Sequence, residues 1–157
     1  MRIVVGSDHA GFALKEHVKS YLQRSGHHVY DVGTDSEESA DYPDYALEAA
    51  RMVASKDADF GVLVCGTGLG MAIAANKVRG VRAVQVMDPE LAEMARRHND
   101  ANVLTLAGRY TDPATAERIV DAFLATPFEG GRHERRVGKI GAIEGEERPG
   151  TIDRKEA

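Results

Sequence analysis

The sequence predicts an α/β protein: a Rossmann-like, three-layer αβα sandwich with a five-stranded parallel sheet and a C-terminal helical extension. Two observations predict this fold. Short runs rich in valine, isoleucine and leucine alternate along the chain with helical patterns of about ten residues or more, as in repeated β-α units. The runs themselves show little apolar–polar alternation, which is typical of parallel strands that are buried on both faces.

The chain begins with an expected strand and a well-marked helix. Five apolar runs are the expected strands, at residues 2–6, 28–33, 60–65, 81–86 and 102–108. The first helix, over residues 12–24, follows from the helical spacing of Leu14, Val18 and Leu22, and Gly26 is placed to close it.

The later helices carry start signals. Their expected ranges are 42–55, 68–78, 88–99 and 112–125. Pro43, Pro89 and Pro113 fall in first turns, where the missing amide hydrogen costs nothing, and Asp88 and Asp112 are suited to cap the helices that they precede. The sequence thus predicts a single domain over residues 1–143 that ends in a basic helix at 132–143. A charged, flexible tail is expected at 144–157.

The composition narrows the class of protein. The 157 residues are 43% hydrophobic and 29% charged, as in a soluble globular protein, and the net charge of −5 disfavours nucleic acid as a partner. A single cysteine cannot form an internal disulfide, which favours a reducing compartment. No run has the length of a signal peptide or a membrane span, so we expect a cytoplasmic protein that does not bind membranes.

A glycine-rich turn follows the third expected strand, in the stretch "VCGTGLGMA". Ligands of parallel sheets bind beyond the carboxyl ends of the strands, and Gly66, Gly68 and Gly70 let backbone amides face such a ligand. A dinucleotide fingerprint is incomplete, because Met71 stands where its third glycine belongs, and a Walker A lysine is absent. The turn is therefore interpreted as a site for an anion or oxyanion.

Cys65 is placed immediately before that turn. A buried cysteine is often only a small apolar side chain, and this interpretation stays open. A thiol beside the amides of a helix start is more easily ionised than a free thiol, so the alternative is a base or a nucleophile.

Other polar residues near expected strand or helix ends have two interpretations each. Asp8 suits a helix cap and His98 a helix C-terminus, while paired arginines usually form a solvated face, yet the same residue types suit a site for a phosphorylated ligand. The candidates are Asp8, His9, Tyr42, His98, Asn99, Arg109, Arg132 and Arg136. The histidines and the cysteine lack metal-ligand spacing, so no metal and no cofactor are expected.

Five motifs together resemble the type B ribose-5-phosphate isomerase family, which includes isomerases of other aldose phosphates. They are "GSDHAGFALK", "DYPDYA", "CGTGLGMAIAANK", "RRHNDANVL" and "EGGRHERRV", in order between residues 2 and 144. The resemblance implies a metal-independent aldose–ketose isomerase of carbohydrate metabolism, most of all one that converts ribose 5-phosphate to ribulose 5-phosphate through an enediolate. It also implies a homodimer or homotetramer in which two subunits share each site.

The resemblance assigns roles to residues. Cys65 matches the base that moves a proton between carbons 1 and 2, and His98 matches the acid that opens the sugar ring, with Asp8 and Thr67 assisting. Substrate-binding positions are matched by His9, Tyr42, Gly66, Thr67, Gly68, Leu69, Gly70, Asn99, Arg109, Arg132 and Arg136. One branch of the family replaces the cysteine with a glutamate after the turn; this chain has Leu69 and Met71 there, so Cys65 remains the candidate base.

Three alternatives stay open at the level of sequence. The same chemistry suits a tetrose 4-phosphate, allose 6-phosphate or galactose 6-phosphate. A non-catalytic module that binds a phosphorylated metabolite needs the same turn. A thiol redox role is disfavoured, because no second cysteine is present to resolve a disulfide.

Overall fold

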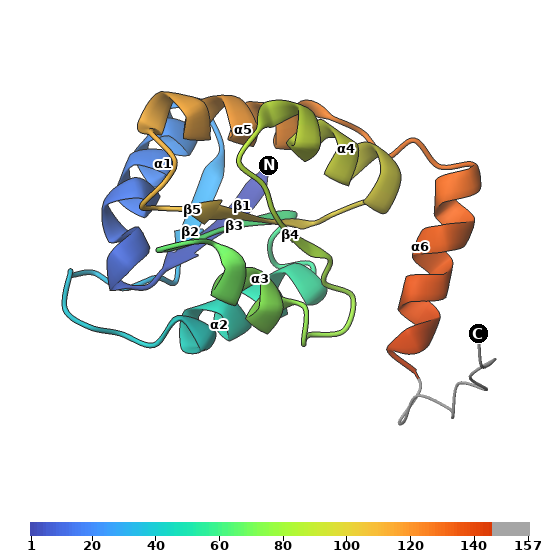
Figure 1. Ribbon diagram of the computed structural model, residues 1–157, viewed down its shortest axis with the longest axis horizontal. Coiled ribbons are helices and arrows are strands. Elements are labelled where there is room, and N and C mark those ends of the chain that lie inside the picture. The colour runs from blue at the N-terminus through green and yellow to red at the C-terminus, as the bar shows by residue number, and fades with distance from the viewer. Residues whose placement is uncertain (146–157) are drawn as a thin grey trace, which may run out of the picture.

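A computed structural model describes residues 1–145, and the expected tail from residue 146 onward lies outside the described residues. Five parallel strands form one sheet in the order β2-β1-β3-β5-β4. Helices cover both faces, and α6 stands beside the sandwich at the end of α4 (Figure 1). The elements are β1 (Arg2–Ser7), η1 (His9–Gly11), α1 (Phe12–Arg24), β2 (His28–Asp31), α2 (Tyr42–Ala54), β3 (Phe60–Cys65), α3 (Leu69–Ala75), β4 (Ala83–Gln85), α4 (Pro89–Asn99), β5 (Val103–Ala107), α5 (Pro113–Ala125) and α6 (Arg132–Ile143).

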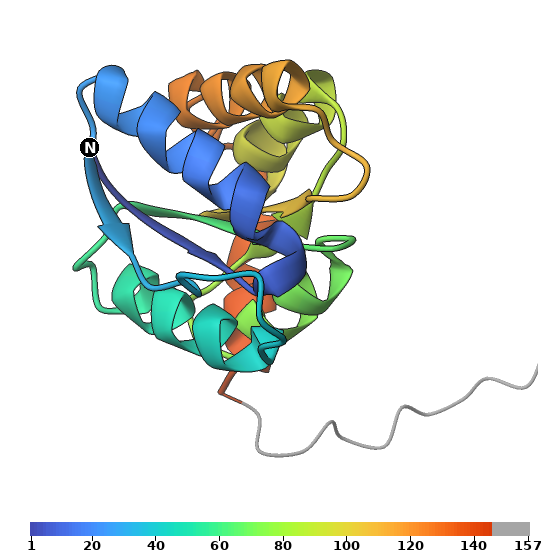
Figure 2. The same cartoon turned by 90° about the vertical axis from the view of Figure 1, so that its left-hand side faces the viewer.

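The predicted fold class is confirmed, and its two-sided burial explains the apolar runs. Alternate residues of β1 serve opposite faces: Ile3 and Val5 pack with α1, α4 and α5, whereas Val4 packs with α2 and α3. These two helical layers and the sheet between them are seen in Figure 2. The residues that point to either face of the central strands are thus apolar. The sequence of these strands therefore shows no apolar–polar alternation.

The strand order creates the crevice that holds the site. From β1 the chain continues through α1 to β2, at one edge of the sheet. From β3 it continues through α3 to β4, at the opposite edge. The connections that leave β1 and β3 therefore diverge, and ligands of open α/β sheets bind at such a point beyond the carboxyl ends of the strands.

Strand β4 and the helix before it are both shorter than the sequence predicts. The expected strand at 81–86 shortens to Ala83–Gln85, and the expected helix at 68–78 shortens to Leu69–Ala75. Asn76 ends the helix and brackets Ala83, donating to its carbonyl and accepting from its amide, each at 2.8 Å. Asn102 likewise accepts from the Arg82 amide at 2.8 Å. Asn102 thus takes the amide of the residue just before β4, whereas the Asn76 bonds hold Ala83, the first residue of the strand.

The basic terminal helix forms over Arg132–Ile143, as expected. Gly130 and Gly131 have positive φ values of 69° and 56° and turn the chain into it. At its other end, the Glu144 carboxylate accepts from the Gly80 amide at 3.0 Å. Within residues 1–145, no helix combines the length and the apolar character needed to cross a membrane.

Candidate active site

A cavity of about 350 Å³ lies where the connections after β1 and β3 diverge. It is lined by Asp8, His9, Ala10, Tyr42, Cys65, Gly66, Thr67, Gly70 and Arg109. Its lining thus comes from segments after β1, β3 and β5 and from the start of α2, segments far apart in the sequence that the sheet brings together.

Cys65 ends β3, and the residue is 4% exposed. Its sulfur accepts a hydrogen bond from the Gly68 amide, with Sγ and N 3.2 Å apart. The residue packs with the apolar core and also lines the cavity. The sulfur is thus at the boundary between the core and the cavity.

Gly68 makes the contact with the sulfur possible. Its φ is +75°, and a Cβ atom built on it would lie 3.0 Å from the carbonyl group of Leu106. The Thr105 hydroxyl, buried under the turn, donates to the Gly68 carbonyl at 2.9 Å. The turn is thus fixed by backbone conformation and by β5, and only glycine fits it without strain.

Asp8 caps η1 and faces the cavity as well. Its carboxylate accepts from the Gly11 amide at 3.0 Å, and the side chain is buried. Gly11 lies directly on β3, because a Cβ atom there would come within 2.4 Å of the Val64 carbonyl oxygen. His9 is held by Ala40, whose amide donates to Nδ1 at 3.1 Å. The same Nδ1 lies 3.3 Å from the Ala40 carbonyl oxygen, so both backbone groups of Ala40 hold the ring.

Arg109 and Tyr42 form walls against two glycines of the turn. A Cβ atom on Gly66 would lie 3.4 Å from Nε of Arg109, and one on Gly70 would lie 2.7 Å from the Tyr42 ring. Because Gly66 and Gly70 have no side chains, the Arg109 guanidinium and the Tyr42 ring can lie against the backbone of the turn. Thr67 is exposed, and its hydroxyl accepts from the Leu69 amide at 3.4 Å.

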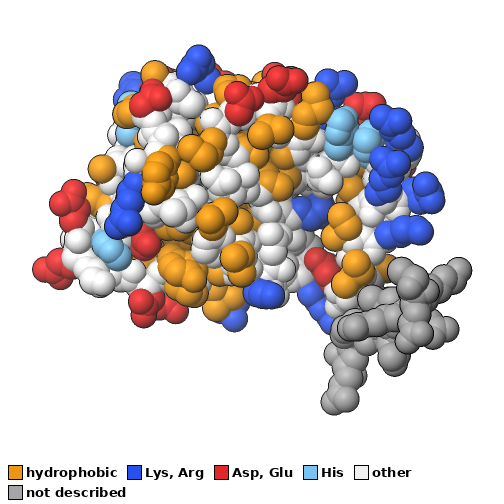
Figure 3. Space-filling view, in the orientation of Figure 1, with side chains coloured by type: hydrophobic (Ala, Val, Ile, Leu, Met, Phe, Trp, Pro, Cys, Tyr) orange, Lys and Arg blue, Asp and Glu red, His pale blue; other side chains and the backbone are white. Residues whose placement is uncertain are grey.

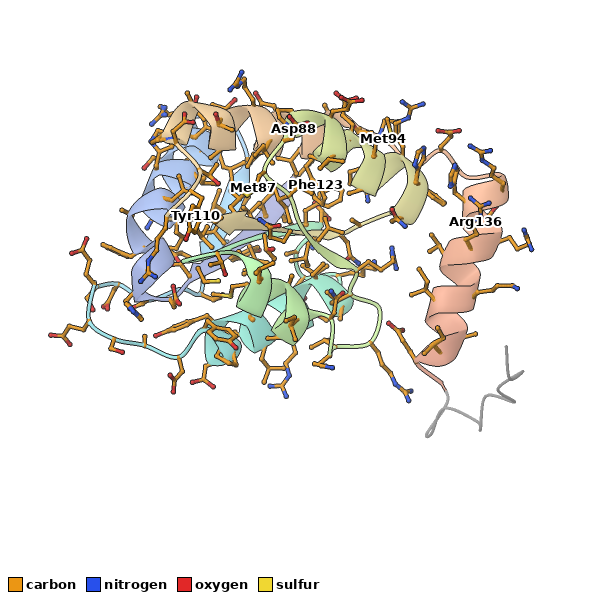
Figure 4. The ribbon with its side chains drawn as sticks, in the orientation of Figure 1. Met87, Asp88, Met94, Tyr110, Phe123 and Arg136 are labelled. Atoms are coloured by element: carbon orange, nitrogen blue, oxygen red, sulfur yellow. The ribbon has the colours of Figure 1, made fainter. Side chains whose placement is uncertain are left out.

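Six expected site residues do not line this cavity. Gly68 and Leu69 belong to the turn beside it, whereas the other four lie elsewhere: His98, Asn99, Arg132 and Arg136. His98 and Asn99 end α4, and the two arginines belong to α6. Arg136 projects from α6 (Figure 4), and Lys and Arg side chains gather with two histidines at that end of the molecule (Figure 3). Within one chain, the expected residues therefore form two groups: the cavity and this α4–α6 cluster.

The α4–α6 cluster contains groups that the sequence analysis passed over. The His98 and His133 rings stack with their centroids 4.2 Å apart, and Glu129 Oε2 lies 3.9 Å from Nε2 of His98. Arg97 pairs with the same carboxylate at 3.3 Å. The sequence offers one signal for His133, which is its position beside Arg132 just after a Gly-Gly pair.

The cluster has metal-ligating residue types but not the geometry. One ligand atom each from His98, Glu129 and His133 lies within 4.8 Å of the others. The two rings, however, are tilted by only 8°, so their in-plane lone pairs point along parallel planes and do not meet at one ion. Arg132 also donates to Nε2 of His133 at 3.3 Å. As they stand, these residues fit an anion better than a cation.

A larger hollow of about 440 Å³ runs along α2. Its lining includes Asp44, Glu48 and Asp57 but neither the cysteine nor a histidine. Carboxylates repel a phosphorylated ligand, and Arg51 is the single basic residue among the described residues that line this hollow. The cavity at Cys65 is the better candidate site on chemical grounds.

A buried ion-pair network supports the loop on the Asp8 side. Lys15 is 1% exposed and donates to Asp31 at 2.9 Å and to the Thr34 carbonyl at 2.9 Å. Burial acts to raise the pKa of Asp31, but hydrogen bonds from Lys19 and Lys15 outweigh it, so the pKa lies below its ordinary value. The network fixes the start of the loop after β2. This loop carries Ala40, whose amide donates to His9.

Comparison with known proteins identifies the family. A model described as Ribose/Galactose Isomerase matches residues 3–140. Ribose-5-phosphate isomerase B of Escherichia coli is 48% identical over 143 residues, which are 91% of this chain and 96% of that protein.

Solved structures agree with this match. A ribose 5-phosphate isomerase of Thermotoga maritima is 56% identical with a TM-score of 0.88, over 90% of this chain and 97% of that one. Ribose-5-phosphate isomerase B of Mycoplasma genitalium, solved with bound ribulose-5-phosphate, is 43% identical with a TM-score of 0.88, over 92% and 97% of the two chains. The chain thus belongs to the ribose/galactose isomerase family of sugar-phosphate isomerases.

Proposed function

We propose that the protein interconverts ribose 5-phosphate and ribulose 5-phosphate, with Cys65 as the base. The observation that carries this proposal is the position of the sulfur: it lies in the wall of a polar cavity, beside a glycine turn, and 3.2 Å from a backbone amide nitrogen. The relatives named for this activity and the bound ribulose-5-phosphate in one of them support the choice of substrate.

The chemistry requires a proton to move between two carbons. The thiolate takes the proton from carbon 2 of the open-chain aldose, and the electrons of that bond form a carbon–carbon double bond while oxygen 1 becomes negative. The proton on oxygen 2 then moves to oxygen 1, and the proton held by the thiol, or one exchanged for it from solvent, is delivered to carbon 1, which gives the ketose and regenerates the thiolate. A positioned base of this kind contributes about 10²–10⁴ to the rate.

Backbone amides of the turn hold the negative oxygen of the enediolate. The amides of residues 66–70 are fixed by Gly68 and by the contact of Thr105 with its carbonyl. Donors already in place stabilise developing charge without reorganisation, and one such donor is worth about 3–4 kcal/mol in an oxyanion hole. Thr67 and Asp8 line the same cavity and are placed to move the hydroxyl protons.

Ring opening and phosphate binding come from a second copy of the chain. His98, Asn99, Arg132 and Arg136 lie outside the cavity of their own chain, and an exposed apolar surface adjoins that cavity. Leu69, Met87 and Tyr110 line a shallow hollow of this surface, with Met87 and Tyr110 labelled in Figure 4, and Ile73 is 64% exposed. An exposed apolar patch of this kind marks an interaction site, and a two-fold dimer would complete two sites at once. A reducing, cytoplasmic location fits a single cysteine that must stay a thiol.

A panel of phosphorylated aldoses tests the substrate. We expect kcat/KM to be highest for ribose 5-phosphate, with smaller values for a tetrose 4-phosphate, allose 6-phosphate and galactose 6-phosphate. The family description names galactose as well as ribose, so a hexose 6-phosphate is the second candidate. Absence of turnover on every sugar, with binding retained, would leave a non-catalytic binding module and end the proposal.

A further inference from the structure

His133 differs from the rest of the helix that carries it. It is 5% exposed, whereas α6 otherwise presents mainly exposed residues, among them Arg132, Arg135 and Arg136. The side chain is buried against the end of α4, where its ring stacks on the ring of His98 with the centroids 4.2 Å apart and the planes 8° from parallel. A buried histidine that nearly faces the expected ring-opening acid is not explained by the cavity or by the phosphate-binding arginines.

Hydrogen bonding indicates that this ring is neutral. Nε of Arg132 donates to Nε2 of His133 at 3.3 Å, and a guanidinium is only a donor, so Nε2 carries no proton. Burial, followed by the nearby positive charges of His98 and Arg132, lowers the pKa of His133, while Glu129 acts weakly in the other direction. The contact with Arg132 and the lowered pKa therefore both describe an uncharged ring stacked on His98.

The backbone holds the stacked ring in place. The amide of Glu129 donates to the Arg97 carbonyl at 3.0 Å, which ties the connection to the end of α4. Two left-handed glycines then reverse the chain, and the His133 amide donates to the Gly130 carbonyl at 3.0 Å. His98 thereby has a flat ring on one side and the Glu129 carboxylate 3.9 Å from its Nε2.

We propose that His133 is a positioning residue: its neutral ring stacks on His98 and sets the plane in which that residue presents its nitrogens to the sugar ring. The inference rests on the proposed role of His98 as the ring-opening acid. Stacking restricts rotation of the His98 side chain, and proton transfer depends on a reacting geometry that is held before the substrate arrives.

Two substitutions separate this role from others. His133→Ala removes the flat face, and we expect kcat to fall by about ten- to a hundredfold with little change in KM, the scale that a misplacement of about 1 Å carries. His133→Phe keeps a flat ring of similar size and is expected to restore most of kcat. The matched control is His28→Ala, an exposed histidine on β2 that contacts Tyr30 edge-on, and it should leave kcat unchanged.

A spectroscopic measurement makes the test independent of activity. The ring protons of His98, assigned by their loss in His98→Asn, are shielded by the stacked neighbour, so their NMR signals should shift in His133→Ala and stay near their positions in His133→Phe. Equal kcat values in the Ala and Phe variants, or a higher KM with unchanged kcat in His133→Ala, would overturn the inference. Failure of the proposed function is distinguishable, because the unsubstituted protein would then show no isomerase activity.

Discussion

The cavity at Cys65 and the α4–α6 cluster are built in different ways. The cavity is positioned by buried backbone, because β1, β3 and β5 pair in the centre of the sheet. Glycines at 66, 68 and 70 let neighbouring residues pack closely against the turn. The α4–α6 cluster is positioned by side chains, through the stack of His98 on His133 and the pairing of Arg97 with Glu129. The first is fixed by the core, and the second by an ion pair and by stacked rings between the end of α4 and the start of α6.

The difference suggests a division of tasks. Proton transfer from carbon needs atoms held in one place, and the interior of a sheet supplies this because close packing allows few alternatives. Binding of a phosphate needs positive charge that a ligand can reach, and exposed arginines supply it at a strength that salt weakens. Each group therefore has an environment suited to its part of the reaction.

The largest expected effect is recovery of activity when the two groups come from different chains. Cys65→Ala and His98→Asn each abolish turnover alone in our account. After mixing and subunit exchange, half of the dimers are mixed and each carries one intact site, so about a quarter of the normal activity should return. Absence of recovery, with exchange verified by labelled subunits, contradicts shared sites.

Next in size is the effect of adding a methyl group at the turn. Gly68→Ala strains a backbone at φ +75° and forces a contact with Leu106, so we expect a loss of about 1–3 kcal/mol in the free energy of unfolding and a large fall in kcat. Urea unfolding and steady-state kinetics measure both. Gly141→Ala is the matched control, because its Cβ atom meets open space in α6 and the helix should gain slightly. An undamaged Gly68→Ala protein would show that the turn is not held as described.

Fold and site were predictable to different extents. The bounds of β3 at Phe60–Cys65 and of α1 at Phe12–Arg24 agree with the sequence analysis, since local apolar patterns and glycine signals determine them. The early end of β4 accompanies the Asn102 side chain, which bonds the Arg82 amide just before the strand from another segment, and no local pattern shows this contact.

The site shows the same limit. Residues beside strand ends, such as Asp8 and Cys65, were predictable to lie together because parallel strands end at one edge. The separation of His98 from them, and its stacking on His133, depends on where α4 ends and how the Gly-Gly turn directs α6. These are tertiary features, which local sequence motifs do not contain. The motifs therefore suggest a single set of site residues, whereas the fold divides these residues into two groups.

A smaller effect concerns salt. Arg136→Gln should raise KM for the sugar phosphate by about tenfold with kcat less affected, because it removes the phosphate contact that we propose and leaves the proposed base in place. In the unsubstituted protein KM should rise between low and high ionic strength, and this rise should be smaller in Arg136→Gln. An unchanged KM would remove Arg136 from the phosphate site.

The smallest expected effect is the pH dependence of stability that Asp31 contributes, in the ion-pair network that supports the loop on the Asp8 side. The pKa of Asp31 is lowered in the folded protein, so its contribution to stability is present above the pKa of an unfolded aspartate, about 3.9, and is lost as pH falls through the folded value. Asp31→Asn should therefore be less stable than the unsubstituted protein at pH 7, with the difference shrinking toward pH 3 in urea titrations. A difference independent of pH would show that the ion pairs with Lys15 and Lys19 contribute little.

Proton exchange at carbon 2 tests the central claim most directly. Ribose 5-phosphate is incubated in D₂O with the unsubstituted protein or with Cys65→Ala, and deuterium at carbon 2 of the recovered aldose is measured by mass spectrometry while binding is followed by calorimetry. We predict exchange with the unsubstituted protein and none above background with Cys65→Ala, although the sugar phosphate still binds. Exchange at an undiminished rate in Cys65→Ala would show that another group takes the proton.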